Sequence, residues 1–205
     1  MIRELDIKWV DSANFVPLNR ELLEMMRDAG AVRFMYGLES GSPKILRYVG
    51  KNFTIPIAEK RLKETWEVGI WSELSLICGF PHERESDVRM TIEFLSRNRK
   101  YIKSAYLNKF FLDGVIKRFP SKYGISIRSD SYESGETLRE AWRGGFDEIN
   151  GLKWEDRKKL TDWSYEQITS AMDKFGIRPG TVIQEILYLG SLPEWDDILK
   201  GNIDF

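Results

Sequence analysis

The feature that most constrains this chain is an alternation of strand-like and helix-like segments over its first 112 residues. Short apolar runs alternate with segments in which apolar residues recur every three or four positions, and Gly30 and Gly69 end two of these helical segments. The predicted strands are 5–10, 31–39, 70–79 and 104–112, and the predicted helices between them are 17–30, 54–69 and 85–99. Such repetition predicts a parallel sheet with right-handed crossovers.

The predicted strands are apolar on one face and polar on the other, because alternate residues of a strand point to opposite sides. The residues predicted to face the helices are Val32, Phe34, Tyr36, Leu38, Leu74, Leu76 and Cys78. The opposite face is predicted to carry Arg33, Met35, Gly37, Glu39, Glu73, Ser75, Ile77 and Gly79, with Asp6, Lys8 and Asn108 as further candidates. Helices can cover only the apolar face, so the polar face is predicted to line a cavity. A closed barrel fills its interior with branched aliphatic side chains, so the pattern favours a curved, open half-barrel.

The alternation stops near residue 113. Gly, Ser, Pro and charged residues dominate 113–153, one helix is predicted at 154–175, and the last thirty residues read as short turns. The predicted class is therefore α/β. Residues 1–125 are expected to form half of a partial (β/α) barrel, and residues 126–205 a mostly helical or irregular C-terminal extension.

Composition excludes several classes of function. The chain has 31 Lys and Arg against 32 Asp and Glu, so bulk charge does not indicate nucleic-acid binding. It has no apolar run of the roughly 18 residues that a membrane span needs and no signal-peptide pattern, so a cytoplasmic protein without a membrane partner is expected. Cys78 and His82 are the only residues of their types, so no disulfide and no metal site are predicted. Cys78 is predicted to be a buried structural thiol.

Three stretches of the sequence resemble one known family. They are MRDAGAVRFMYGLESGSPKILRYVGKNFT at 26–54, WEVGIWSELSLICGFPHERESDVRMTIEFL at 66–95 and RFPSKYGI at 118–125. Together they resemble the later half of a radical S-adenosylmethionine (SAM) domain, and most closely the enzymes that carry a cobalamin-binding domain upstream. The resemblance runs from about residue 5 to 125, with a weaker echo at 154–175. It implies a partial barrel and SAM as a ligand, and it allows cobalamin as a further cofactor.

One departure from this family concerns its iron–sulfur cluster. Members hold a [4Fe–4S] cluster with three cysteines of a CxxxCxxC loop, and this chain has one cysteine and no such loop. The resemblance therefore implies either a fragment of a longer protein or a shortened relative, whose cluster depends on a missing N-terminal segment or a partner chain. The strand at 5–10 is then expected to present an unpaired edge, which suits a partner chain or a second copy of this one.

The resemblance also implies where SAM is held. Glu39, at the end of its strand, stands where the family has a Gln or Glu near the SAM ribose, and Ser40 follows it. Within the loop CGFPHE (78–83), backbone groups around Ile77 and Gly79 are expected beside the adenine, with Pro81 fixing the loop. For Glu39, the alternative is a capping contact to the turn at 40–42.

Other residues near this predicted site have two interpretations each. Glu73, Ser75 and Arg33 either contact SAM or a substrate, or the charged ones pair with each other. His82 stands where the family usually has Gly, and a positive φ suits His poorly. Glu83 and Asp87 are expected to be charges at a helix N-terminus.

The favoured function is the C-terminal part of a radical SAM enzyme that supplies the ribose and adenine side of the pocket and part of the substrate lining. The alternative is a cluster-free, non-catalytic binding or partner module that keeps the fold. A third hypothesis, a hydrolase that uses Glu39 and Glu73, is weakest because no nucleophile–base pair is visible. No catalytic residue and no substrate are assigned.

Overall fold

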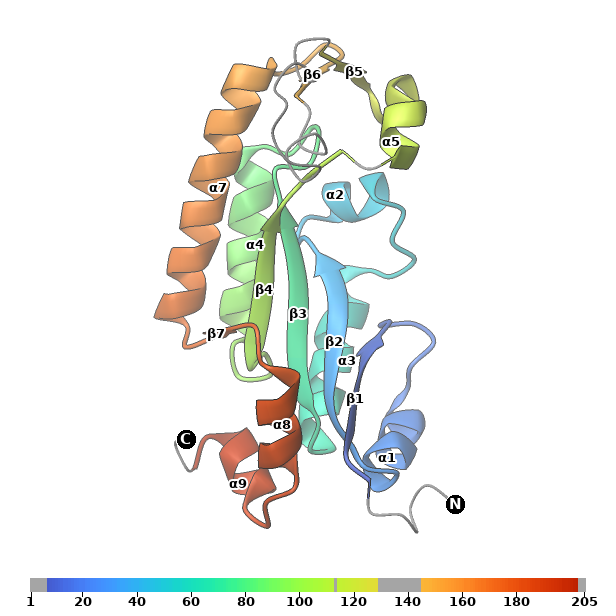
Figure 1. The fold of residues 1–205 in the computed structure, drawn as a ribbon, viewed down its shortest axis with the longest axis vertical. Helices are drawn as coiled ribbons and strands as arrows, with labels where there is room; N and C mark the ends of the chain where they lie inside the picture. Colours follow the sequence, from blue (N-terminus) through green and yellow to red (C-terminus); the bar gives the residue numbers. More distant parts are fainter. Residues whose placement is uncertain (1–6, 113, 129–144, 203–205) are drawn as a thin grey trace.

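The computed structural model describes residues 7–112, 114–128 and 145–202 (Figure 1). Its elements are β1 (Trp9–Ala13), α1 (Arg20–Asp28), β2 (Ala31–Glu39), α2 (Pro43–Tyr48), α3 (Ile55–Glu67), β3 (Trp71–Cys78), α4 (Glu85–Asn98), β4 (Ser104–Lys109), α5 (Gly114–Arg118), a 3₁₀ turn (Pro120–Tyr123), β5 (Ile125–Ile127), β6 (Phe146–Glu148), α7 (Trp154–Lys174), β7 (Arg178–Pro179), α8 (Ile183–Gly190) and α9 (Trp195–Lys200). Five strands form one parallel sheet in the order β1-β2-β3-β4-β7, and β5 and β6 form an antiparallel pair. The predicted α/β class with a parallel sheet is confirmed.

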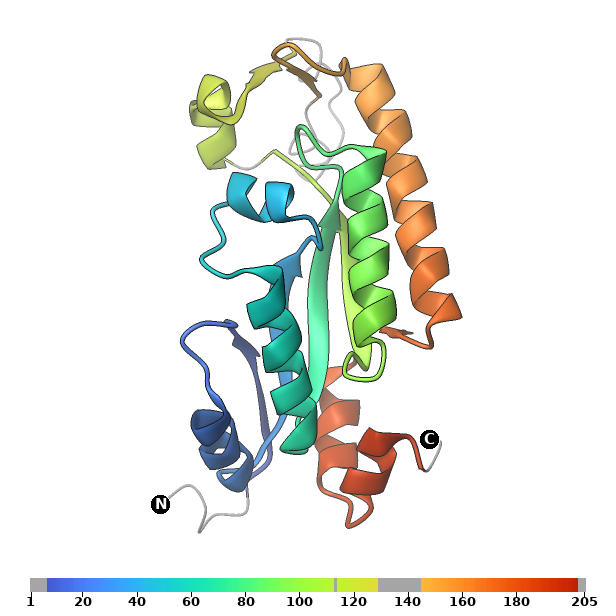
Figure 2. The same cartoon turned by 180° about the vertical axis from the view of Figure 1, so that it is seen from behind.

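The helix-facing side of the sheet carries the main core. Figure 2 shows α3 and α4 across this face, with α7 beside α4. The core contains Phe34, Tyr36, Leu38, Leu74, Leu76 and Cys78 from the strands, together with Leu62 of α3 and Phe94 of α4. Full burial of a large apolar side chain contributes about 1.5–3 kcal/mol. The energy of burying these side chains therefore determines which side of each strand faces the helices.

Val32 breaks the predicted alternation. The register between β1 and β2 shifts at this point and leaves Val32 as the extra residue of a β-bulge. Its side chain therefore packs on the opposite face, against Trp71 of β3 and Ile186 of α8. The prediction that Val32 shares the face covered by α3 and α4 is wrong, because the bulge turns its side chain to the other side of the sheet.

Residues 178–200, here called the C-terminal segment, cover the amino-terminal end of that opposite face. β7 pairs with β4, and α8 lies in front of the lower part of the sheet in Figure 1. Trp195 of α9 stacks on Trp71, with 6.2 Å between the ring centroids. The sequence predicts only short turns here. It misses this strand and these helices because two-residue and six-to-eight-residue elements are too short to show a clear period.

The first strand is displaced from its prediction. β1 begins at Trp9 and ends at Ala13, whereas 5–10 was expected, and Asp6 lies outside the described residues. Backbone pairing with β2 makes a strand of the polar residues 11–12, so tertiary context overrides a weak local preference. Within the described sheet β1 has one strand neighbour, which is the edge position expected for the first strand. The domain boundary near residue 125 stays a prediction, and β7, from beyond it, joins the same sheet.

Among the described helices, none combines the length and the apolar character that a membrane crossing requires.

Candidate functional site

Glu39 ends β2 in an unusual backbone conformation. Pairing between β2 and β3 joins Gly37 to Ser75 and then Glu39 to Leu76, so a bulge precedes Glu39. Glu39 has φ +65°, and the N–H of Ser40 donates to the carbonyl of Leu38 at 2.9 Å across it. A positive φ costs a residue with a side chain about 1–3 kcal/mol, and such strain gathers at functional sites. Bulges likewise re-aim side chains beside active sites.

The Glu39 carboxylate has one engaged oxygen and one free oxygen. Lys51 Nζ donates to Oε1 at 2.9 Å, whereas Oε2 is buried and has no hydrogen-bond partner. Gly37 makes room for this pair, because a Cβ there would lie 2.8 Å from Oε1 and 3.1 Å from the lysine Nζ. A buried acceptor without a donor is costly, so Oε2 suits a hydroxyl or N–H group of a ligand.

The turn after Glu39 is satisfied without its carboxylate. The N–H of Gly41 donates to Thr91 Oγ1 at 2.9 Å, and the N–H of Ser42 donates to Ser40 Oγ at 3.1 Å. The capping alternative for Glu39 is therefore wrong. Ser40 is fully buried and its hydroxyl also contacts Thr91 Oγ1 at 3.2 Å. Its side chain holds the turn against α4, which corrects the expectation that Ser40 contacts a cofactor.

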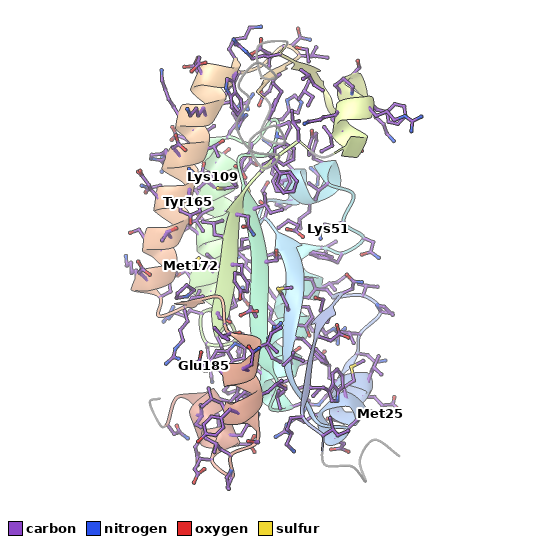
Figure 3. All side chains as sticks on the ribbon, in the orientation of Figure 1. Met25, Lys51, Lys109, Tyr165, Met172 and Glu185 are labelled. Carbon is purple, nitrogen blue, oxygen red and sulfur yellow. The ribbon has the colours of Figure 1, made fainter. Side chains whose placement is uncertain are left out.

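Ser75 and Ile77 remain accessible on the polar face. Both are half-buried, and Asn108 of β4, opposite Ile77, is exposed. Figure 3 shows Lys51 beside the carboxyl end of β2, at the same edge of the sheet. Ser75 and Ile77 are thus the part of the predicted lining that the chain leaves half-exposed, and Glu39, with 17% of its side chain exposed, lies at the end of the neighbouring strand.

Glu73 and Arg33 lie instead beneath the C-terminal segment. Glu73 is fully buried, and its Oε2 accepts hydrogen bonds from Ser104 Oγ at 2.7 Å and from the Thr181 N–H and hydroxyl at 2.8 and 2.7 Å. Arg33 Nη1 lies 3.4 Å from Glu73 Oε1. The expectation that Glu73 and Arg33 line an open cavity is therefore corrected: they form the internal pair that was the alternative.

The loop at 78–83 takes the conformation that favours glycine. Gly79 has φ +87° and donates its N–H to Glu83 Oε2 at 2.6 Å, and a Cβ on Gly79 would lie 2.5 Å from the side chain of Thr161. Pro81 is buried. His82 has φ +64° despite its side chain, and its N–H donates to Glu148 Oε1 at 2.7 Å. This hydrogen bond helps to hold a backbone conformation that is uncommon for any residue with a side chain.

Glu148 binds two arginines behind this loop. Arg84 donates to both carboxylate oxygens, at 3.1 and 2.6 Å, and the buried Arg157 donates to Oε1 and to the Glu83 carbonyl, the latter at 3.0 Å. Burial raises the pKa of Glu148, but hydrogen bonds from Arg84 and from the Leu152 and His82 N–H groups outweigh it and bring the pKa to about 2. The cluster links β6 and α7 to the start of α4.

Glu83 directly precedes Arg84, the N-cap of α4, so it stands at the helix N-terminus but outside the first turn, and its carboxylate accepts from the Gly79 N–H. Asp87 lies within the first turn of α4 and accepts from the Arg84 N–H at 2.9 Å. Burial raises the pKa of Glu83 from 4.5 to about 7, against the opposing effects of the Gly79 N–H and Arg157.

Replacing Glu83 with glutamine is expected to flatten the dependence of stability on pH. Between pH 4.5 and 7 the native Glu83 keeps its proton while the unfolded one loses it, so the wild type loses roughly 2–3 kcal/mol as pH rises. Glutamine keeps an acceptor for Gly79 and does not titrate. Urea unfolding from pH 5 to 8 measures the difference, with the exposed Glu85→Gln as control. A wild type and a Glu83→Gln variant with parallel pH profiles would contradict this account.

Cys78 is fully buried and its thiol lies 3.9 Å from the Thr161 carbonyl. Burial raises its pKa to about 12. A buried, protonated thiol is inert, as the sequence predicts. Within the described ranges, no group of three or more His, Cys, Asp or Glu side chains is placed to hold a metal ion.

A pocket of about 160 Å³ lies at the opposite end of the sheet from Glu39, between β3 and the C-terminal segment. Its lining includes Trp71, Pro179, Thr181, Glu185 and Ile186. Figure 3 shows Glu185 at that end, far along the sheet from Lys51. Two buried carboxylate oxygens lack a hydrogen bond among the described residues, Glu39 Oε2 and Glu73 Oε1. We place the candidate site at Glu39 because Glu73 Oε1 faces the Arg33 guanidinium at 3.4 Å. At Glu39, by contrast, Lys51 contacts the other oxygen, Oε1, and Oε2 lies unpartnered at the carboxyl end of its strand.

Comparisons with solved structures identify the fold. Coproporphyrinogen III oxidase (HemN) from Escherichia coli, described as a radical SAM enzyme, matches with a TM-score of 0.57 and 11% identity over 82% of this chain and 32% of its own. The methyltransferase TsrM from Kitasatospora setae, solved with tryptophan and a SAM analogue, matches with a TM-score of 0.57 and 14% identity over 93% and 44%. This chain has a radical SAM-type fold. The cobalamin-dependent SAM radical enzyme OxsB also matches this chain, with a TM-score of 0.56 and 16% identity over 84% of this chain and 31% of its own.

Curated relatives match less of this chain. An uncharacterized methyltransferase of Pyrococcus horikoshii is 32% identical over 93 residues, which is 45% of this chain and 20% of that protein. An uncharacterized protein of Methanopyrus kandleri is 23% identical over 96 residues, or 46% and 18%. No protein-family model matches. The chain thus spans about a fifth of these relatives and less than half of the solved structures named above.

The sequence alone does not single out Lys51, Thr181, Glu148 or Arg157. Lys51 lies in the stretch VGKNFT, which is part of the resemblance, so its position could have marked it. Thr181 lies 108 residues from Glu73. Glu148 and Arg157 lie 64 and 74 residues from Arg84 and Glu83, so no local signal marks these contacts.

Proposed function

We propose that this chain forms the ribose and adenine side of a SAM pocket in a radical SAM enzyme, together with part of the substrate lining. The observation that carries the proposal is the buried, unpartnered Oε2 of Glu39, at the carboxyl end of a parallel strand. Parallel α/β folds place their sites at this edge. A ribose presents adjacent hydroxyl donors that a carboxylate accepts, so the residues present fit the sugar of SAM.

The adenine is proposed to lie against β3 and the loop that follows it. Ile77 offers a half-buried apolar side chain beside Glu39, and Gly79 and Pro81 hold the loop around the base. Ser75, on the same face, is proposed to line the pocket toward the substrate. Ser40 and Glu73 are left out of this set, because internal hydrogen bonds occupy their side chains.

The named neighbours support a reaction class for the whole protein. TsrM is described as a radical SAM methyltransferase with cobalamin and a [4Fe–4S] cluster bound, and the Pyrococcus relative is named as a methyltransferase. We therefore propose that the whole protein transfers a methyl group from SAM, with cobalamin as a further cofactor.

The residues of this chain do not fit a [4Fe–4S] cluster. Such a cluster requires several thiolates, and the single thiol is buried with a pKa of about 12. We propose that any cluster ligands come from residues outside this sequence. The same observation favours a second candidate, a cluster-free binding module. An in-frame CxxxCxxC in the DNA upstream would support the enzyme, and its absence would support the module.

Replacing Glu39 with glutamine is expected to weaken SAM binding about 10- to 100-fold, because charge-assisted hydrogen bonds contribute about 1.5–3 kcal/mol. Isothermal calorimetry on the wild type, Glu39→Gln and Glu39→Ala measures this effect. The exposed Glu166→Gln of α7 is the matched control and should bind as the wild type does. Equal affinity in all four proteins would rule out the role assigned to Glu39.

A further inference from the structure

We propose that Lys51 is a positioning residue for the ribose: it holds Glu39 by one carboxylate oxygen and so presents the other oxygen to the sugar. The inference rests on the proposed SAM pocket and adds to it a residue from outside the sheet.

Both the backbone and the side-chain ammonium group of Lys51 are held by contacts within the chain. Its N–H donates to the Leu46 carbonyl at 2.9 Å, which anchors its backbone to the end of α2. Its ammonium group reaches Glu39 Oε1 at 2.9 Å, with 25% of the lysine side chain and 17% of the glutamate side chain exposed. Gly37 leaves space for the Lys51–Glu39 ion pair, because a Cβ at this position would lie within 3.1 Å of both charged groups.

This arrangement determines how Glu39 can bind. The contact at Oε1 restricts rotation of the carboxylate, so Oε2 has one defined position. The ammonium also balances the negative charge, which lowers the cost of removing water from the carboxylate when a ligand covers it. A neutralised carboxylate with one free acceptor suits an uncharged hydroxyl donor better than a metal cation. The pair therefore suits an uncharged hydroxyl donor, which the ribose of the proposed ligand supplies.

The test compares two nucleosides that differ only in their hydroxyls, adenosine and 2′,3′-dideoxyadenosine. In Lys51→Met, affinity for adenosine is expected to fall about tenfold while affinity for dideoxyadenosine stays unchanged. Lys51→Arg restores a donor to Oε1 and should bring adenosine affinity back to within about threefold of the wild type. Lys60→Met removes another lysine that lies near a glutamate, 3.9 Å from Glu64, and serves as control.

The ratio of the two affinities in each sample is the readout, because a partly unfolded fraction lowers both affinities equally. A tenfold lower ratio in Lys51→Met, with rescue by arginine, supports the inference. An unchanged ratio in Lys51→Met, while Glu39→Gln lowers it, overturns the role of Lys51 and leaves the pocket standing. Absence of adenosine and SAM binding by the wild type overturns the proposed function itself, and the inference with it.

Discussion

Alanine in place of Glu148 is expected to lower the free energy of unfolding by about 3–5 kcal/mol, the usual cost of breaking a buried charge pair on one side. The carboxylate is the hydrogen-bond partner of Arg84 and of the buried Arg157, whose Nε and Nη1 have no partner of their own. Its removal leaves a buried guanidinium without its carboxylate. It also removes the acceptor of the His82 N–H, which helps to hold a positive φ.

Urea unfolding at pH 7 measures this loss, with the exposed Glu166→Ala expected to stay within about 0.5 kcal/mol of the wild type. The double variant Glu148→Met with Arg157→Met should be more stable than Glu148→Ala, because no buried charge is left unpaired. A loss below about 1 kcal/mol in Glu148→Ala would show that the cluster does not hold α7 to the start of α4.

Alanine in place of Glu73 is expected to have a similar effect, about 3–5 kcal/mol, at the other end of the sheet. The substitution leaves the buried Arg33 without a counter-charge and removes the acceptor of Ser104 and Thr181. Because Thr181 lies two residues before α8, within the C-terminal segment, we also expect faster hydrogen exchange at the amides of 183–199.

Two measurements separate these effects. Urea unfolding gives the global loss, and hydrogen exchange followed by mass spectrometry gives the local one. Glu185→Ala, an exposed change on α8, is the control for both. Wild-type exchange rates in the C-terminal segment of Glu73→Ala would contradict the view that Glu73 fastens this segment across the sheet.

Local patterns predict the strands of the sheet well where burial and period agree. β2 matches its prediction at 31–39, and the helix-facing residues Phe34, Tyr36 and Leu38 are all buried in the main core. The bulges at Val32 and before Glu39 could not be predicted, because an extra residue in a strand changes the pairing without changing the hydrophobic pattern.

The site residues also differ in how far local sequence predicts them. Glu39 is predicted from its place at the end of a strand and from the resemblance, and its free oxygen is a property that only the fold reveals. Glu73 lies on the predicted face, but a threonine 108 positions later in the chain covers it. No local sequence pattern indicates such a contact. A polar residue on a strand therefore predicts a solvent-exposed face only where no distant segment of the chain covers that residue.

The most direct test of the central claim is a crystal structure of the chain with S-adenosylhomocysteine bound. We expect the ribose hydroxyls within about 3.2 Å of Glu39 Oε2, with Lys51 still on Oε1 and the base against Ile77. A nucleoside bound elsewhere, with Glu39 Oε2 still unpartnered, would contradict the account.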